Sequence, residues 1–173
     1  MIQTVRDVQT VTPEGEPLAP LPEGVTFHEV TTHVDDRGTV CELYDERWDW
    51  HPDPLVFAYT FTIRPGKVKG WGMHKRHEDR YLLLHGEMLC VFYDEREDSS
   101  TSGLVATVVL SHHNRRLMNI PIGVWHATKN IGDTDLMCVN FPTQPYQHTD
   151  PDKYRLPLDT DQIPYTWSDL QGW

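Results

Sequence analysis

The feature that most constrains this sequence is a series of short segments rich in Val, Ile, Thr, Phe and Tyr, separated by Gly, Pro, Asp and Asn. Such segments are typical of β-strands, and the residues between them favour tight turns. No window repeats apolar residues at the helical period of 3.6, so we expect little helix. Many short strands at this spacing predict an all-β sandwich or closed barrel. The expected strands span residues 25–30, 39–44, 55–63, 81–84, 88–93, 104–110, 117–120 and 136–141.

The length of 173 residues fits a single domain with its own core. Residues 1–24 are rich in Pro, Glu and Thr, which disfavours a helix and predicts an extended N-terminal arm. Residues 25–141 hold the predicted barrel. Residues 142–173 place recurrent prolines among Asp and Tyr. They predict an irregular C-terminal segment that wraps the barrel rather than extending its sheet.

The charge balance restricts the partners of the chain. A formal net charge of -11 repels a phosphate backbone, which disfavours nucleic acid and anionic membranes but not one phosphorylated small molecule. No apolar run approaches the roughly 20 residues that a membrane helix needs. The N-terminus does not have the pattern of a secretory signal, and three cysteines in apolar contexts indicate reduced thiols. We therefore expect a cytoplasmic protein.

Two histidine-containing stretches stand out from the strand pattern. One is Gly72-Met73-His74-Lys75-Arg76-His77-Glu78-Asp79, and the other runs from Pro121 to Asn130 through His126. A Pro-Gly turn followed by a strand sends alternate side chains inward, so His126 can enter the barrel and meet His74. Two imidazoles in a semi-dry cavity can transfer protons or hold a metal ion. The alternative is a pair of hydrogen-bonded core histidines.

The second stretch fits the second cupin motif, P-x-G-x-x-H-x-x-x-N, at every fixed position. The first fits the first cupin motif loosely, with Gly72 in place of an earlier His and Asp79 where many metal cupins carry Glu. The chain also resembles the dTDP-4-keto-6-deoxyhexose 3,5-epimerase family, a branch of the cupins, over most of 25–167. The further residues that carry this resemblance are Asp36-Arg37-Gly38 with Glu42, Asp94-Glu95-Arg96 with Ser99-Ser100-Thr101, Leu110-Ser111 with Asn114 and Arg116, and 159–167.

The resemblance implies a cupin-type jelly-roll β-barrel and a homodimer whose subunits exchange an arm. It implies that His74 is the catalytic base, oriented by Asp159, and that the reaction needs no cofactor. A neutral imidazole held by a carboxylate can take a proton next to a ketone near neutral pH. Arg37 would reach the nucleotide diphosphate of the neighbouring subunit, and Glu42 the nucleotide base. The resemblance also places Asn114 and His126 among the substrate contacts.

The sequence departs from the family at positions that matter for the chemistry. Trp71 stands where the family has Arg, Asp79 where it has the Lys that steadies the enolate oxygen, and Val139 where it has an acid Tyr. An enolate needs positive charge or hydrogen-bond donors at its oxygen. Arg80 takes the place of that Lys if the alignment shifts by one residue. Tyr59 stands at one of the family's polar positions and is a further candidate substrate contact.

These observations leave three hypotheses open. The favoured one is a nucleotide-sugar epimerase or isomerase that uses His74 and Asp159 without metal. The second is a metal-dependent cupin enzyme, whose divalent ion has the candidate ligands His74, His77, Asp79 and His126. The third is a non-catalytic cupin whose aromatic residues bind a sugar or another small ligand. The residues in question are Tyr59, Phe61, Trp71 and Trp125.

Overall fold

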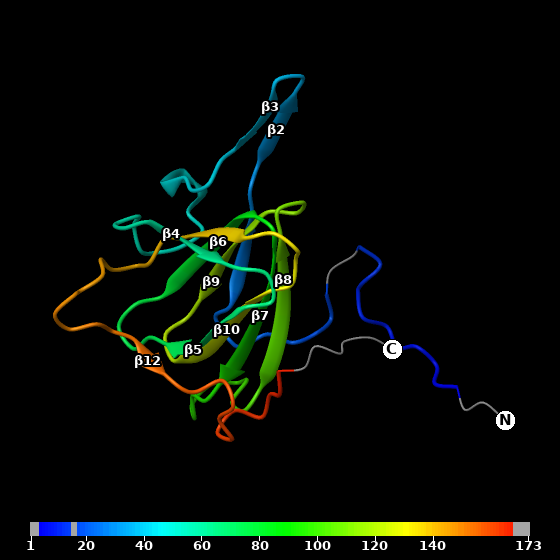
Figure 1. The fold of residues 1–173 in the computed structure, drawn as a ribbon, viewed down its shortest axis with the longest axis vertical. Coiled ribbons are helices and arrows are strands. Elements are labelled where there is room, and N and C mark those ends of the chain that lie inside the picture. The colour runs from blue at the N-terminus through cyan, green and yellow to red at the C-terminus, as the bar shows by residue number, and fades with distance from the viewer. Residues whose placement is uncertain (1–3, 15–16, 168–173) are drawn as a thin grey trace.

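The computed structural model describes residues 4–14 and 17–167, and almost all of its regular structure is β (Figure 1). Two five-stranded antiparallel sheets pack against each other as a jelly-roll barrel. The first sheet has the order β1 (Thr26–Glu29), β9 (Arg116–Ile120), β6 (Asp79–His85), β11 (Leu136–Asn140) and β4 (Tyr59–Ile63). The second has the order β12 (Tyr154–Arg155), β5 (Val68–Met73), β10 (Val124–Asn130), β7 (Glu87–Asp94) and β8 (Val105–Ser111). The predicted all-β barrel is confirmed.

A separate hairpin projects away from the barrel at the top of Figure 1. It consists of β2 (Thr32–Asp35) and β3 (Gly38–Cys41), which pair only with each other, and nearly all of its residues are exposed. A short 3-10 helix, η1 (Glu46–Trp48), follows it. An isolated two-stranded hairpin buries too little apolar surface to be stable alone. Since β2 and β3 pair only with each other, the outer edge of each strand is unpaired.

The main core lies between the two five-stranded sheets. Strand alternation explains its composition, because β6 sends Tyr81 and Leu83 inward while Leu82 packs on the outer face. The inward set from both sheets is Val25, Ile63, Tyr81, Leu83, Met88, Cys90, Phe92, Leu110, Met118, Ile120, Val124, Leu136 and Cys138. At the end of the barrel near β4 and β5 this packing gives way to a hollow.

The C-terminal segment covers the outer face of the second sheet. Trp71 and Trp125 point outward from β5 and β10 and pack with Ile163 of that segment. Within it β12 pairs with β5, with Tyr154 opposite Met73. The expectation that this segment would not extend the sheet was therefore wrong, although the extension is only two residues long. The pairing brings the residues just before β12 to the mouth of the barrel.

The strand expectations missed β2, β5 and β12, whereas β10 was expected from the Pro-Gly turn before His126. In β5 the glycines Gly70 and Gly72 hide the strand, because glycine is depleted in strands and has no side chain to show alternation. Within the residues that the structure describes, no helix is long and apolar enough to cross a membrane.

Candidate active site

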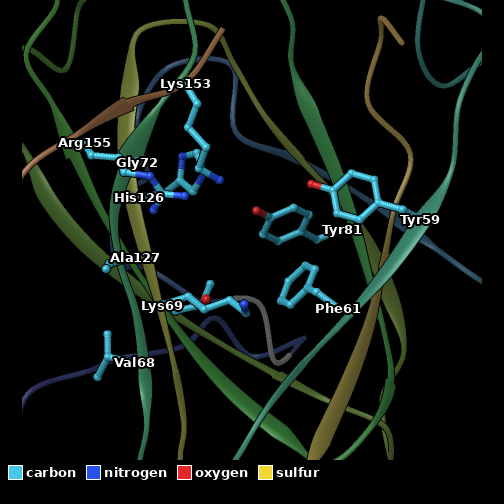
Figure 2. A pocket seen from close by; sticks show the side chains of 12 residues that line it. Tyr59, Phe61, Val68, Lys69, Gly72, Tyr81, His126, Ala127, Lys153 and Arg155 are labelled. Atoms are coloured by element: carbon cyan, nitrogen blue, oxygen red, sulfur yellow. The ribbon is translucent and has the colours of Figure 1, made fainter. Parts of the chain in front are cut away.

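A hollow of about 340 Å³ opens into the barrel (Figure 2). Strands β4 and β6 supply aromatic side chains to one wall, and β5 and β10 form the opposite wall, with His126 on it. The C-terminal segment adds two cations at the rim. The lining residues are Tyr59, Phe61, Val68, Lys69, Gly70, Gly72, Tyr81, His126, Ala127, Thr128, Lys153 and Arg155.

At the wall of the hollow, two imidazoles meet around one buried carboxylate, with His126 on the wall and His74 behind it. Nε2 of His74 lies 3.2 Å from Oδ2 of Asp79, and Nε2 of His126 lies 3.4 Å from the same oxygen. The two rings are 5.6 Å apart. All three residues are buried, and Nε2 of His74 has no hydrogen-bond partner despite its short distance to Asp79. His74 itself does not line the hollow. The structure thus brings His74 and His126 together inside the barrel, but only His126 reaches the hollow.

Asp79 is held in place by further donors. The amide of Asn140 donates to Oδ1 at 2.7 Å, and the hydroxyl of Tyr81 donates to Oδ2 at 3.1 Å. Burial alone would raise the pKa of Asp79, but the neighbouring imidazoles of His126 and His74 outweigh it and hold this pKa well below its ordinary value. Asp79 therefore stays ionised in the interior.

His74 is oriented from the C-terminal segment. Its Nδ1 donates to the backbone carbonyl of Asp152. The Asp152 carboxylate accepts hydrogen bonds from the backbone N–H of Lys75 at 3.0 Å and of Arg76 at 2.7 Å, and it lies 2.9 Å from Nδ1 of His77. Burial lowers the pKa of His74, but the Asp79 carboxylate raises it by more, so the net shift is upward. Asp152 of the C-terminal segment thus fixes both the turn at Lys75 and Arg76, which follows β5, and the ring of His74.

His77 extends the same cluster. Its Nε2 lies 3.8 Å from Oδ1 of Asp79, and its ring centroid is 4.0 Å from that of His74. Burial and the nearby charge of His74 lower the pKa of His77. The shortest polar contact of His77 is from its Nδ1 to the Asp152 carboxylate. His77 therefore helps to hold the C-terminal segment against the cluster.

The structure does not place the predicted orienting residue Asp159 beside His74. Asp159 is exposed and lines a different surface hollow with Leu158 and Thr160. Asp152 precedes β12, the strand by which the tail pairs with β5, and Asp159 follows it. The carbonyl of Asp152 holds the ring instead.

Arg80 also differs from its predicted role as a substrate contact. It is buried, and its guanidinium donates to the backbone carbonyls of Asp53, Pro54 and Phe141 at 2.8, 2.9 and 2.6 Å. Since Asp79 points inward, strand alternation sends Arg80 to the outer face of the sheet. It ties loops to the barrel and does not reach the hollow.

The remaining predicted contacts fall into two groups. Tyr59 and His126 line the hollow, whereas Trp71 is packed under the C-terminal segment. Arg37, Glu42 and Asn114 are exposed and lie outside the lining of the hollow, the first on the projecting hairpin, where it pairs with Asp35. These three cannot be assigned to the hollow of their own chain.

Sequence reasoning missed several polar residues of the site, among them Asp152, Lys153 and Tyr81. Asp152 and Lys153 lie in a tail rich in Asp, where nothing local distinguishes them. The stem of Lys153 crosses Gly72, where an added methyl group would lie 3.5 Å from its Cε. Tyr81 could have been found, because it lies two residues after Asp79 on the same face of a strand.

With this geometry established, the relationship to known proteins is clear from sequence. The family profile of dTDP-4-dehydrorhamnose 3,5-epimerase matches residues 21–170. This chain belongs to that family. A probable low-salt glycan biosynthesis epimerase of Haloferax volcanii is 36% identical over 146 residues, which are 83% of this chain and 93% of the relative. A spore coat polysaccharide biosynthesis protein of Bacillus subtilis is 32% identical over 84% of this chain and 96% of its own length.

Solved structures of the epimerase family share the architecture. A dTDP sugar isomerase from Desulfovibrio desulfuricans superposes with a TM-score of 0.80 at 28% identity, covering 88% of this chain and 98% of that chain. A dTDP-4-dehydrorhamnose 3,5-epimerase from Bacillus anthracis has a TM-score of 0.73 at 17% identity, covering 86% and 87% of the two chains, and shares the fold. Epimerases of this type need no cofactor or metal ion for their reaction. This chain is accordingly an epimerase-family enzyme of carbohydrate biosynthesis.

Proposed function

We propose that this protein epimerises a nucleotide-linked 4-keto sugar by removing and returning a proton on a carbon next to the ketone. The observation that carries the proposal is the cluster of His74, Asp79 and His126 at the wall of a hollow, in a chain of the epimerase family. Fold alone would not assign an activity, because one barrel hosts many reactions. The argument therefore depends on what these side chains can do.

The proposed proton acceptor is the imidazole pair around Asp79. A carbonyl can only accept, so the Nδ1 of His74 that faces Asp152 carries the proton of the neutral ring. The lone pair is then on Nε2, where a base needs it. The ionised Asp79 stabilises the imidazolium that forms after proton transfer. His126 contributes the part of the pair that touches the hollow.

The enolate formed by proton removal needs positive charge at its oxygen. Asp79 occupies the position of the family's Lys, and we propose that Lys153 supplies the cation instead. Burial lowers the pKa of Lys153, and the charges of Arg155 and Lys69 around the hollow lower it further, against the opposing effect of Asp79. These three cations also suit the diphosphate of a sugar nucleotide, in a chain whose net charge is -11.

Two hydroxyl groups replace the acid tyrosine that is absent at Val139. The neighbouring residue Asn140 pairs in register with Tyr59 of β4 and Tyr81 of β6, and both tyrosines line the hollow opposite His126 (Figure 2). Burial, and then the charge of Asp79, raise the pKa of Tyr59 to about 12. Tyr59 thus remains protonated and is the proposed proton donor for the opposite face of the sugar.

We further propose a cytoplasmic homodimer in which the hairpin β2–β3 completes the hollow of the second copy. The hairpin projects away from its own barrel (Figure 1), and Arg37 near its tip is exposed. Its unpaired edges favour pairing with another chain. Arg37 and Glu42 would then contact the nucleotide of the neighbour. Free cysteines at 41, 90 and 138 accord with a reducing compartment.

Deuterium exchange from heavy water tests the proposed reaction. Wild-type protein is expected to incorporate deuterium next to the ketone of dTDP- or UDP-4-keto-6-deoxyglucose. His74→Gln and His126→Gln should slow exchange by about 10²–10⁴-fold, the usual contribution of general base catalysis. His112→Gln, a change at a half-exposed histidine outside the hollow, should leave it unchanged. Absence of exchange with both sugar nucleotides, together with absence of dTDP or UDP binding, would eliminate the proposal.

A further inference from the structure

The nitrogen and oxygen atoms that meet at Asp79 have an unusual electrostatic arrangement. Nδ1 of His74 faces the carbonyl of Asp152, and Nδ1 of His126 lies 3.2 Å from the carbonyl of Val124. Because a carbonyl only accepts, each Nδ1 carries a proton, and a neutral ring then directs the lone pair of Nε2 at the Asp79 carboxylate. Each of these lone pairs is repelled by the negatively charged oxygen of Asp79 unless a positive charge lies between the nitrogen and the oxygen.

A proton on Nε2 of His74 does not resolve this arrangement. That nitrogen is buried and lies 3.2 Å from Oδ2 of Asp79, yet it is without a hydrogen-bond partner. A metal ion bonded to the three atoms has different directional requirements. Bonds of about 2.0–2.1 Å at tetrahedral angles place two ligand atoms about 3.3 Å apart. The two distances from Oδ2, 3.2 and 3.4 Å, agree with that separation.

We infer that Nε2 of His74, Oδ2 of Asp79 and Nε2 of His126 form a binding site for a divalent transition-metal ion such as Zn²⁺. The three ligand atoms all lie within 4.8 Å of one another and are buried. Two imidazoles and one carboxylate suit Zn²⁺ and its neighbours, whereas Mg²⁺ and Ca²⁺ prefer oxygen ligands. Such an ion uses the lone pair that the proposed base needs. It therefore competes with the epimerisation reaction and is not its cofactor.

The surroundings of the three ligands fit this assignment. Metal-ligating histidines usually donate their second N–H to a backbone carbonyl or a carboxylate, and ligating carboxylates are themselves hydrogen-bonded. Here the two Nδ1 atoms face carbonyls, and Asp79 accepts from Asn140 and Tyr81. The polar groups around the site therefore orient the ligands.

A second group, His74 with His77 and Asp152, also has ligand atoms within 4.8 Å of one another. Its atoms are already engaged, since Asp152 accepts from the backbone N–H of Lys75 and Arg76 and pairs with Nδ1 of His77. It therefore serves as support, and His77 is not a ligand in the proposed site.

The test measures metal binding directly, without any sugar. Protein stripped with a chelator and then freed of it is titrated with Zn²⁺ by calorimetry, and with Co²⁺ by its visible absorption, which is intense for low-symmetry four-coordinate ions. We expect one tight ion per chain. His126→Gln and Asp79→Asn should each weaken it by at least about 100-fold, since even loss of an outer partner costs 10–100-fold. The control is His112→Gln, whose Nδ1 also lies near a carbonyl, that of Gly86 at 2.9 Å, and it should bind as wild type does.

Urea unfolding of each variant in the presence of chelator establishes whether the variant folds. If Asp79→Asn does not fold, His126→Gln alone tests the metal site. Absence of a tight ion in the wild type, or equal binding by His126→Gln and wild type, would overturn the inference. If wild type exchanges deuterium, Zn²⁺ should suppress that exchange at the concentrations at which it binds, and undiminished exchange at saturating Zn²⁺ would contradict the competition. If no sugar exchanges, the proposed function fails while the metal titrations still decide this inference.

Discussion

The position of Asp152 leads to a prediction that separates the structure from the family resemblance. In the Asp152→Ala variant the carbonyl that faces His74 remains, but the carboxylate that accepts from the N–H groups of Lys75 and Arg76 and pairs with His77 is lost. The turn after β5 then loses the acceptor of its two backbone N–H groups and keeps the exposed contacts of Arg76 with Asp150 and Gln144 besides the carbonyl at His74. Since this turn carries His74, the ring should lose its fixed position relative to Asp79.

The expected cost follows from the contacts. Hydrogen bonds to a charged group contribute about 1.5–3 kcal/mol each when buried. The backbone N–H groups in this partly exposed turn can bind water after the change, so we expect a total loss near the low end, about 3 kcal/mol. For a chain of this length that lowers Tm by about 6–12 °C. A displacement of the reacting group by about 1 Å costs about 100-fold in rate, and we expect deuterium exchange to fall by that factor.

Urea unfolding, thermal unfolding and deuterium exchange measure these effects, with dTDP and UDP binding to confirm that the hollow is intact. The matched control is Asp159→Ala, which removes an exposed carboxylate from the same segment. It should change stability by less than about 0.5 kcal/mol and leave exchange unchanged. The opposite pattern, with exchange lost in Asp159→Ala and retained in Asp152→Ala, would show that the orienting residue is the one expected from the family.

Three further predictions concern the scaffold. Arg80→Met should lower the free energy of unfolding by about 3–5 kcal/mol, measured in urea, because several buried carbonyls lose their donor; a loss below about 1 kcal/mol would contradict this role. Burial raises the pKa of Asp94, but hydrogen bonds from an arginine and two hydroxyls hold it well below its ordinary value. The contribution of the Asp94 carboxylate to the free energy of unfolding is therefore present above about pH 4 and is lost as pH falls. The difference in this free energy between wild type and Asp94→Asn should be about 2–3 kcal/mol at pH 7 and should narrow in acid. A difference that does not change with pH would refute this. Gly86→Ala should cost about 2–4 kcal/mol, because Gly86 has φ +87° and a methyl group there would lie 2.9 Å from Cβ of Leu136. Gly103→Ala, at φ +81° with open space around it, should cost only about 1 kcal/mol, and equal losses in thermal unfolding would contradict the steric argument.

The barrel and the central pair of histidines could be predicted from local features. Turn residues and β-branched segments defined most strands, and the Pro121-to-Asn130 motif placed His126 on an inward-facing strand position. Both features act over a few residues, so sequence alone specifies them. The outward position of Arg80 was also available from alternation, because it lies between the inward-facing Asp79 and Tyr81.

The contribution of the tail could not be predicted in the same way. Whether Asp152 or Asp159 reaches His74 depends on where the segment crosses the barrel, which is decided by the pairing of β12 with β5 and by packing on Trp71. These are contacts between residues about 80 positions apart, and no local pattern encodes them. The role of Lys153 depends on the same crossing.

The short strand β12 gives the enzyme a single point of assembly. Asp152 and Lys153 immediately precede it, one anchoring the turn of His74 and the other crossing the rim of the hollow. If the segment lifts from β5, the proposed base loses its alignment and the enolate loses its proposed counter-charge in the same event. A protease cut before residue 150 should therefore abolish turnover in one step, even in barrels that stay folded. Regulation of this enzyme would need to act on only one short stretch of backbone.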